Sequence, residues 1–347
     1  MTISPRFRRA LTAASAIALT TVVLTGCAGT DNDAPADDQR TTVRFALDWT
    51  PNVNHTGLYV ALHEGYFEDA GIDVEILPFN NSNPEVLVDA GQAEFGISFQ
   101  DTSSLSIASG ADLTSVLAVQ QTWATEVAVL GDRNDITSPA DLDGLVFGGF
   151  DNPAETITMQ GVVQAAGGEG DFETVVLGTS AYEALYSGDV DFTVPFVAVE
   201  GVEAEQRGID LKTFAYTDYG FPDAYQVIVV GNGAWLEENP DVARDFVQAL
   251  ARGYEDSIAD PEATAEILQE ENSGLLTELD LLVEGQQMLS EGYMLDENGD
   301  FGLQTQEHWS ELGEFLFDTG LLTDRDGTPL TEQPDWSEFF TNEYLQD

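Results

Sequence analysis

Apolar runs and amphipathic stretches alternate regularly along the chain from Thr42 onward. An apolar run at 43–47 is followed by a helical stretch at about 55–70, which Gly71 closes, and by a second apolar run at 74–77. Strand, helix and strand in this order predict a βαβ unit. The series continues with a helix opened by Pro84, a strand at 95–98, a helix from about 101 and a strand at 115–119. The pattern predicts an open α/β sheet of mostly parallel strands flanked by helices.

A second series of the same kind begins near residues 127–130. It contains strands at 145–148, 174–177 and 190–194 and helices at 153–166 and 181–187. Within the two series, segments 88–97 and 185–194 resemble each other, because each ends a helix on Gly, places an acid three positions later and begins a strand with an aromatic residue. Any connection between a helix and a strand shares some of these features, but the equivalent placement favours two lobes of like design.

The chain is therefore predicted to form two α/β lobes. The folded part, roughly 300 residues, exceeds what one hydrophobic core usually organises. We expect residues 42–125 to form the first part of lobe 1 and residues 126–225 to form lobe 2. Residues 226–347, with helical stretches after Pro240, after Pro261 and at 304–317, should return to lobe 1. Small molecules bind outside the carboxyl ends of strands, so two facing lobes would line one cleft.

The N-terminus has the pattern of an exported lipoprotein. Three arginines within the first nine residues precede an apolar stretch at 10–24, which closes on Leu24-Thr25-Gly26-Cys27. This predicts a signal peptide at 1–26 and a lipid group on Cys27, the single cysteine of the chain. A membrane anchor is the alternative, but the apolar stretch is shorter than the roughly 20 residues that a spanning helix needs. Residues 27–41 are predicted to form a flexible tether between the lipid group and the folded part. The signal peptide and the lipid group place the protein outside the cytoplasm, anchored to the cell membrane.

The charge of the chain excludes several classes of partner. Acidic residues number 63 against 11 lysines and arginines, which gives a formal net charge of −52. Nucleic acid and anionic lipid are therefore excluded as binding partners. The acids are spread along the whole chain, which favours a strongly hydrated surface suited to a salty habitat.

The strongest candidate for a binding site is the segment 47–59, between the first predicted strand and the first helix. Trp49 offers a flat face on which a planar heterocycle can stack. Asn52 and Asn54 can donate and accept hydrogen bonds, although capping the helix is an alternative role for one of them. His55 lies at the helix start, and Tyr59 ends the segment.

Further candidates follow other predicted strands. Phe150 and Asp151 come after a Gly-Gly strand end, so Phe150 could clamp a ring against Trp49 from the other lobe. Glu155 and Glu200 could accept hydrogen bonds from an amine, or could be surface acids. The candidate ligand-binding residues are Trp49, Asn52, His55, Tyr59, Phe99, Phe150, Asp151, Glu155 and Glu200.

The segment 47–59 also resembles a known family. Together with Glu64-Gly65-Tyr66-Phe67 and Gly71-Ile72-Asp73-Val74-Glu75 it is similar to bacterial importer-binding proteins for pyrimidine precursors of thiamine, in the NMT1/THI5-like superfamily that includes the fungal thiamine-pyrimidine synthase. Further similar stretches are 149–156, 200–203, 218–223 and 341–345. The resemblance implies the hinge-closing periplasmic-binding-protein fold of the second type, a ligand such as formylaminopyrimidine or hydroxymethylpyrimidine, and an ABC permease as partner.

Two alternatives remain beside this binding role. One is a binding protein of the same fold for another planar ligand, such as riboflavin or an aromatic sulfonate. The other is an enzyme like the fungal synthase, in which the histidine matching His55 is consumed and a lysine holds a cofactor. That relative's cysteine-rich segment is absent here, and the single lysine, Lys212, lies outside the similar stretches. We therefore expect no catalysis and no cofactor. No metal is expected either, because the three histidines lack a ligand spacing.

Overall fold

The computed structural model describes residues 40–79, 82–150 and 153–346. The predicted signal peptide, Cys27 and the tether before Arg40 lie outside the described residues, and so does Asp151. The chain from Gln39 onward forms one compact unit. No helix within the described ranges combines the length and the apolar character needed to cross a bilayer.

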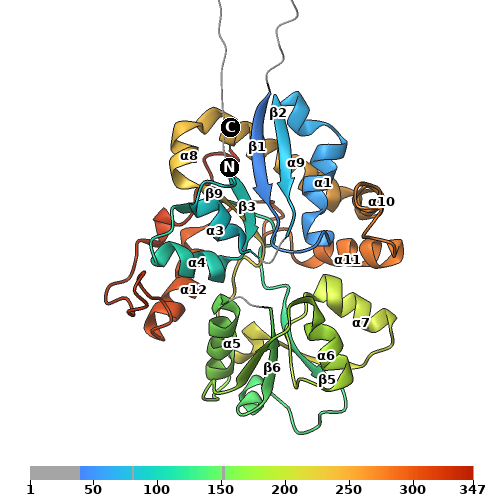
Figure 1. Ribbon diagram of the computed structural model, residues 1–347, viewed down its shortest axis with the longest axis vertical. Coiled ribbons are helices and arrows are strands. Elements are labelled where there is room, and N and C mark those ends of the chain that lie inside the picture. Colours follow the sequence, from blue (N-terminus) through green and yellow to red (C-terminus); the bar gives the residue numbers. More distant parts are fainter. Residues whose placement is uncertain (1–39, 80–81, 151–152, 347) are drawn as a thin grey trace, which may run out of the picture. The chain divides into compact units, whose positions relative to one another are not determined.

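The first lobe is built on a five-stranded sheet with the order β2-β1-β3-β9-β4 (Figure 1). Its strands are β1 (Thr41–Ala46), β2 (Ile72–Leu77), β3 (Phe95–Ser98), β4 (Leu113–Ala118) and β9 (Ile228–Asn232). β1 is parallel to β2 and β3, in agreement with the predicted βαβ unit, whereas β9 is antiparallel to β3 and β4. The sequence analysis did not identify β9.

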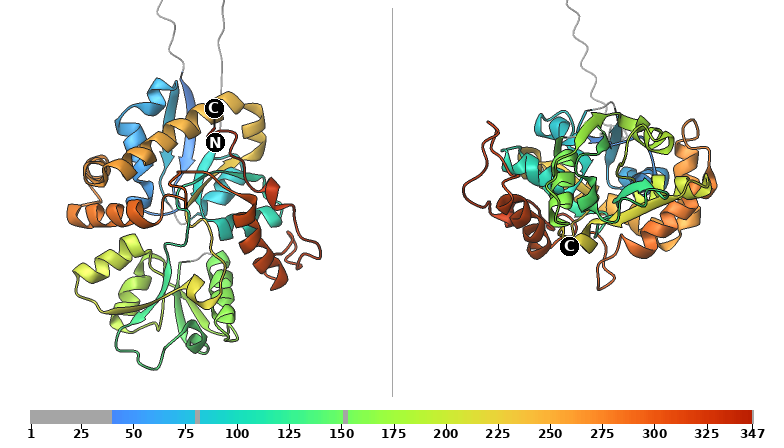
Figure 2. Two further views of the ribbon diagram at one scale, coloured as in Figure 1. Left: turned by 180° about the vertical axis from the view of Figure 1, so that it is seen from behind. Right: turned by 90° about the horizontal axis from the view of Figure 1, so that it is seen from below.

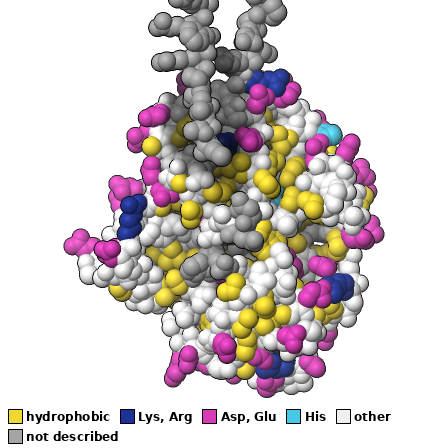
Figure 3. Space-filling view, in the orientation of Figure 1, with side chains coloured by type: hydrophobic (Ala, Val, Ile, Leu, Met, Phe, Trp, Pro, Cys, Tyr) yellow, Lys and Arg dark blue, Asp and Glu magenta, His cyan; other side chains and the backbone are white. Residues whose placement is uncertain are grey.

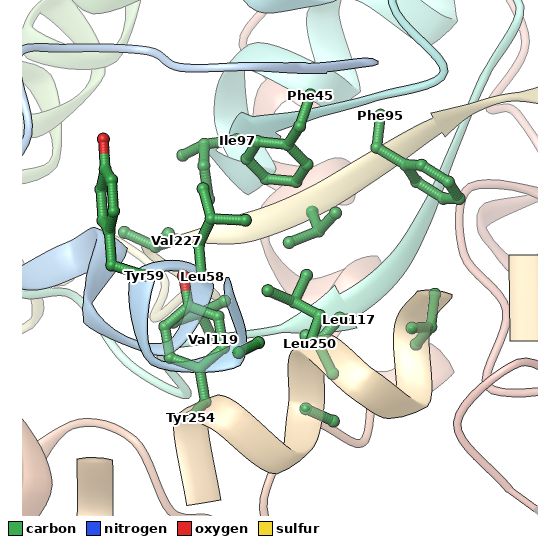
Figure 4. Close-up of a cluster of buried hydrophobic side chains, with 14 of the residues drawn as sticks. Phe45, Leu58, Tyr59, Phe95, Ile97, Leu117, Val119, Val227, Leu250 and Tyr254 are labelled. Carbon is green, nitrogen blue, oxygen red and sulfur yellow. The ribbon is translucent and has the colours of Figure 1, made fainter. Parts of the chain in front are cut away.

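Side chains that alternate along β1 bury both faces of this sheet. Phe45 faces the same core as Phe95 (Figure 4). There Phe246 stacks on Phe95 with ring centroids 4.3 Å apart. Ala46 faces the opposite core with Val88. Helices α1 (Thr56–His63) and α9 (Pro240–Ala259) cover the first face, and α3 (Pro84–Asp89) covers the second, as Figures 1 and 2 show. The period of two in β1 therefore matches a sheet that is buried on both sides.

The helical stretch predicted at 55–70 is interrupted, which corrects that expectation. It consists of η1 (Val53–His55), α1 and α2 (Tyr66–Asp69). Gly65 separates the two α-helices in the left-handed conformation, with φ of 75°. A left-handed residue cannot continue an α-helix, so the chain turns there.

The second lobe contains two small sheets. β5 (Glu126–Leu130) pairs antiparallel with β8 (Leu211–Ala215), and β6 (Val146–Gly149) pairs in parallel with β7 (Glu173–Val176). The predicted strand at 190–194 is reduced to bridges, of Phe192 with Phe147 and of Thr193 with Ala128. The helical elements here are η2 (Pro139–Leu142), α5 (Pro153–Ala165), η3 (Gly178–Ser180), α6 (Ala181–Ser187), the π-helix η4 (Val197–Gly201), α7 (Val202–Gln206) and η5 (Tyr216–Tyr219).

The two similar segments found in the sequence have the same local structure. Gly91 and Gly188 follow α3 and α6 with φ of 65° and 77°. In both segments the acid three residues later, Glu94 or Asp191, accepts a backbone N–H from a neighbouring strand. The donors are Arg44 at 2.6 Å and Val146 at 2.9 Å. Each acid therefore fixes its turn against the adjacent strand.

Two segments connect the lobes and bond to each other. The segment after β4 and the segment before β9 share hydrogen bonds from the N–H groups of Val119 and Gln120 to the carbonyl of Val227. The side chain of Gln226 accepts the hydroxyl hydrogen bond of Thr125 at 2.7 Å. The side chain of Asp223 accepts that of Thr122. The connection is thus a paired ribbon.

The C-terminal part returns to the first lobe but also contacts the second. Its helices are α8 (Gly233–Glu238), α9, α10 (Pro261–Glu271), α11 (Leu279–Gly292), α12 (Gln306–Asp318) and η6 (Trp336–Glu338), and α4 (Gln100–Ala108) lies beside α12. Phe315 of α12 contacts Phe221 at a centroid distance of 4.9 Å. Gly285 of α11 lies against η4, where a Cβ atom would be 2.2 Å from the carbonyl oxygen of Ala198.

Candidate functional site

A cavity of about 150 Å³ lies among residues of both lobes and of the connecting ribbon. Its aromatic lining consists of Trp49, Phe79, Phe99, Trp123, Phe150, Tyr182, Phe196 and Tyr216. Its carboxyl groups belong to Asp48, Glu85, Asp101, Glu155 and Glu200. Rings and carboxyl groups that converge on one enclosed space form the default candidate for a small-molecule site.

Most of the residues singled out in the sequence lie at this cavity. The structure brings together Trp49, Asn52, Phe99, Phe150, Glu155 and Glu200 from segments far apart in the chain. His55 and Tyr59 do not line it, and Asp151 lies outside the described residues. The carboxyl ends of β1, β3 and β6 thus supply the site, as the rule for open α/β sheets predicts.

The turn after β1 is held by its own polar groups. His55 Nδ1 accepts the backbone N–H of Asn52 at 3.1 Å, and His55 Nε2 lies 2.8 Å from Asp48 Oδ1. With Nδ1 as acceptor, the proton of a neutral imidazole is on Nε2 and is donated to Asp48. Asn52 Oδ1 also accepts the N–H of Asn54 at 2.9 Å. This network presents Asp48 and Trp49 to the cavity.

The structure corrects the predicted places of His55 and Tyr59. The side chain of His55 is fully buried behind Asp48, so its part in the site is to position that carboxylate. Tyr59 is 7% exposed and packs with Leu58 in the core of the first lobe (Figure 4). Helical periodicity in the sequence does not tell which side of α1 faces a cleft. In the structure, Tyr59 lies on the side of α1 that faces the core.

The two rings expected to clamp a ligand contact each other. Trp49 and Phe150 have ring centroids 5.6 Å apart at an interplanar angle of 85°, an edge-to-face pair. Phe79 lies 4.9 Å from Trp49 on the first-lobe side, and Tyr182 lies 5.3 Å from Phe150 on the second. A continuous aromatic wall therefore crosses from one lobe to the other.

Glu155 and Glu200 have parallel surroundings. Glu155 Oε2 accepts the N–H of Phe150 at 2.9 Å, and Glu200 Oε2 accepts the N–H of Phe196 at 3.1 Å. Burial raises the pKa of Glu155 to about 8 and that of Glu200 to about 7. Desolvation disfavours the charged form of both, so each carboxyl can hold a proton near neutral pH.

Two further acids on the first-lobe side are bound by hydroxyl groups. Glu85 accepts from Ser98, and Asp101 accepts from Thr158 of α5 at 2.5 Å. Burial raises the pKa of Glu85 to about 7 and also raises that of Asp101. Because Thr158 belongs to the second lobe, the bond to Asp101 crosses between the lobes.

The sequence analysis missed several of these residues. Asp48 directly precedes Trp49, and Asp101 follows the same strand end as Phe99, so proximity to residues already chosen could have identified both. Glu85, Tyr182 and Phe196 carry no such signal, because only the tertiary fold brings them to the cavity.

The acids elsewhere do not form a metal site in the part of the chain that the structure describes. No group of three or more His, Cys, Asp or Glu side chains there is arranged to hold a metal ion. Figure 3 shows Asp and Glu side chains spread over the viewed face with few Lys and Arg between them. Acidic side chains thus dominate the charged groups of this face, with hydrophobic and uncharged areas between them.

Comparison with known proteins gives one family. The profile of the family described as NMT1/THI5 like matches residues 52–264. The formylaminopyrimidine-binding protein of Halalkalibacterium halodurans is 33% identical over 294 residues, which cover 82% of this chain and 87% of that protein. The riboflavin-binding protein RibY of Chloroflexus aurantiacus is 26% identical over 328 residues, covering 90% and 89%.

A solved structure has the same fold. The periplasmic aliphatic sulphonate binding protein SsuA of Escherichia coli superposes with a TM-score of 0.62 at 13% identity, covering 86% of this chain and 91% of that one. The predicted two-lobed α/β fold of the periplasmic-binding-protein type is thereby confirmed.

Proposed function

Because the chain belongs to the NMT1/THI5 like family, we propose that it is the substrate-binding protein of an ABC importer and captures a thiamine-type aminopyrimidine for delivery to a membrane permease. The observation that carries this proposal is the cavity in which Trp49 and Phe150, from different lobes, meet beside Glu155 and Glu200. An aromatic wall with a few converging polar groups is suited to a planar heterocycle.

The chemistry of an aminopyrimidine complements these residues. Its exocyclic amine is a donor, its ring nitrogen accepts or, when protonated, donates, and its faces are apolar. A carboxylate at Glu155 or Glu200 accepts from the amine and from a protonated ring nitrogen. The ring would enter between Trp49 and Phe150 and replace their mutual contact with stacking on the ligand.

The size of the cavity favours a single ring over a flavin. About 150 Å³ is well below the roughly 300–1,000 Å³ of pockets that bury drug-sized ligands. Riboflavin, with three fused rings and a sugar chain, is therefore the less supported alternative. An aromatic sulfonate brings a negative charge to a lining that already carries carboxyl groups.

Two observations count against the synthase as a second candidate. His55 is fully buried and both of its nitrogens have partners, so it is not placed for chemistry in the cavity. Lys212 donates to the carbonyls of Arg133 and Ile136 at 2.6 and 3.0 Å, away from the cavity lining. A binding protein without catalytic activity is the function that these positions support.

The location follows from the proposed lipid group on Cys27. A receptor tethered outside the membrane, with lobes at 42–125 plus 226–347 and at 126–225, would release its ligand to a permease when the lobes separate. Replacing Cys27 with Ser should move the protein from the membrane fraction to the soluble fraction. Unchanged detergent partitioning of that variant would contradict the anchor.

Calorimetry tests the proposed function. The protein should bind 4-amino-5-hydroxymethyl-2-methylpyrimidine or its formylamino analogue, and binding should raise the free energy of unfolding by about 2.7 kcal/mol at a hundredfold excess over Kd. Riboflavin should bind much more weakly. Binding of riboflavin alone would assign the protein to flavin transport, and a mass change confined to the peptide of His55 would support the synthase.

A further inference from the structure

The described lining of the cavity contains acidic side chains but no basic ones. Among the described residues, five that line the cavity carry a carboxyl group, and none is a Lys, Arg or His. The acids come from both lobes, with Asp48, Glu85 and Asp101 on the first and Glu155 and Glu200 on the second. A ligand inside meets acids on both sides.

The basic side chains of the described part of the chain are engaged elsewhere. Five arginines pair with acids outside the cavity lining, namely Arg40, Arg44, Arg133, Arg207 and Arg244, and Arg325 donates to the carbonyl of Gly110. Arg252 lies 3.7 Å over the ring of Tyr66, and Lys212 is bound to carbonyls. None of these cations lines the cavity, so the described part of its wall offers no positive charge that would compensate an added negative one.

Four of the five acids are held by hydroxyl or backbone N–H donors, and Asp48 is held by His55. Hydroxyl groups bind Glu85 and Asp101, and backbone N–H groups bind Glu155 and Glu200. A neutral donor stabilises a carboxylate without cancelling its charge. Burial already raises the pKa of Glu85, Glu155 and Glu200 to about 7 or 8. The surroundings of these carboxyl groups therefore disfavour their negatively charged form. A like charge brought into such surroundings is strongly disfavoured.

We propose that the cavity accepts its heterocycle only when the ligand carries no anionic group, that it excludes the phosphate ester of the same ring, and that Glu155 and Glu200 set this selectivity. This inference rests on the proposed binding role. The sulfonate-binding fold relative shows that the two-lobed fold itself also serves anions. The exclusion therefore belongs to the lining of this chain.

Calorimetry at pH 8.5 with a matched pair of ligands tests the exclusion. The probes are 4-amino-5-hydroxymethyl-2-methylpyrimidine and its phosphate monoester, which is dianionic at this pH because its second pKa is about 6. The phosphate should bind at least ~100-fold more weakly. The neutral dimethyl ester of that phosphate separates charge from size, and it should bind clearly more tightly than the monoester.

Variants identify the residues. Replacing both acids, as Glu155→Gln with Glu200→Gln, should reduce the discrimination between alcohol and phosphate about tenfold or more, whereas Glu173→Gln, an exposed acid on β7, should leave it unchanged. Equal binding of alcohol and phosphate would overturn the inference and leave the proposed function intact. A dimethyl ester as weak as the phosphate would make size the cause. Failure of both the alcohol and its formylamino analogue to bind would instead contradict the proposed function.

Discussion

The two sides of the cavity hold their carboxyl groups in different ways. On the first-lobe side, Asp48, Glu85 and Asp101 are bound by side chains of other elements, those of His55, Ser98 and Thr158. On the second-lobe side, Glu155 and Glu200 each accept the backbone N–H of a phenylalanine a few residues earlier in the same segment.

From this difference we infer that the first-lobe acids support the fold and that the second-lobe acids recognise the ligand. The first-lobe acids complete networks of buried polar groups, so their removal leaves donors without acceptors. The second-lobe acids accept the N–H of the local backbone at one carboxylate oxygen, and Glu200 also has a hydrogen bond with the side chain of Tyr182. We therefore expect changes on the first side to affect folding and changes on the second side to affect affinity.

Asp48→Ala should give the largest loss of stability. It leaves the buried Nε2–H of His55 without its acceptor, at a cost of about 1–3 kcal/mol in the free energy of unfolding. Asp48→Asn, which keeps an oxygen acceptor, should recover most of that loss. Urea denaturation of both variants measures the difference. Equal stability of the Ala variant and the wild type would mean that the acids of the first lobe are not structural.

Trp49→Ala should reduce affinity rather than stability. Deletion of aromatic stacking on a base costs about 1–3 kcal/mol of binding. The side chain is only partly buried, so the free energy of unfolding should change little. Calorimetry with the aminopyrimidine measures the loss, and Trp49→Phe, which retains a ring, serves as control. Wild-type affinity in a folded Ala variant would place the ligand elsewhere.

Glu155→Gln and Glu200→Gln should differ from each other in affinity. Hydrogen bonds to charged groups contribute about 1.5–3 kcal/mol, so only the carboxylate that faces the amine and the ring nitrogen should lose that amount. Neither change should lower the free energy of unfolding, because the Gln side chain keeps an oxygen that can accept the N–H of Phe150 or Phe196. The same calorimetric titration decides which acid binds. Unfolding of either variant would contradict the inferred difference between the acids of the first lobe and those of the second.

The stability of the ligand-free protein should also depend on pH, through the two second-lobe acids. Folding raises the pKa of Glu155 from 4.5 to about 8 and that of Glu200 to about 7, so the folded state retains protons that the unfolded chain releases. Their contribution is therefore complete below pH 4.5 and is lost as the pH rises through 7 to 8. The melting temperature of the ligand-free protein should fall between pH 6 and pH 9.

The double Gln variant is the control for this fall. Without the two titrating groups its melting temperature should change less over the same range. An equal slope in the variant and the wild type would assign the pH dependence to other groups.

Local signals in the sequence predicted many of the elements and several residues of the cavity lining. The bounds of β3 were predicted as observed, and the predicted helix at 153–166 differs from α5 by one residue. The sequence singled out Trp49 and Phe150 as aromatic residues that follow strand ends, and both line the cavity. Glu155 and Glu200 were left open between surface and site, and both line the cavity.

Other features depend on contacts between distant residues. The run Ile228–Asn232 is buried throughout, so its pattern does not distinguish a central strand from other core segments, and its antiparallel pairing with β3 and β4 is a tertiary choice. Likewise, the sequence indicates that His55 starts a helix but not that its imidazole turns back to Asp48.

The position of β9 has a consequence for the order in which the chain can fold. β9 lies between β3 and β4 in the sheet. The edge of β3 that contains Phe95 is therefore paired only after Gly231 of β9 has joined the sheet. Until then β3 presents an open edge, the kind of strand that associates with other chains, and pairing so distant in sequence is slow to form. The last residue of the cavity lining is Gln226. A chain that emerges from its amino end therefore exposes all described residues of the cavity lining before β9, the strand that completes the first sheet. Until β9 has emerged, these residues belong to an incompletely folded lobe.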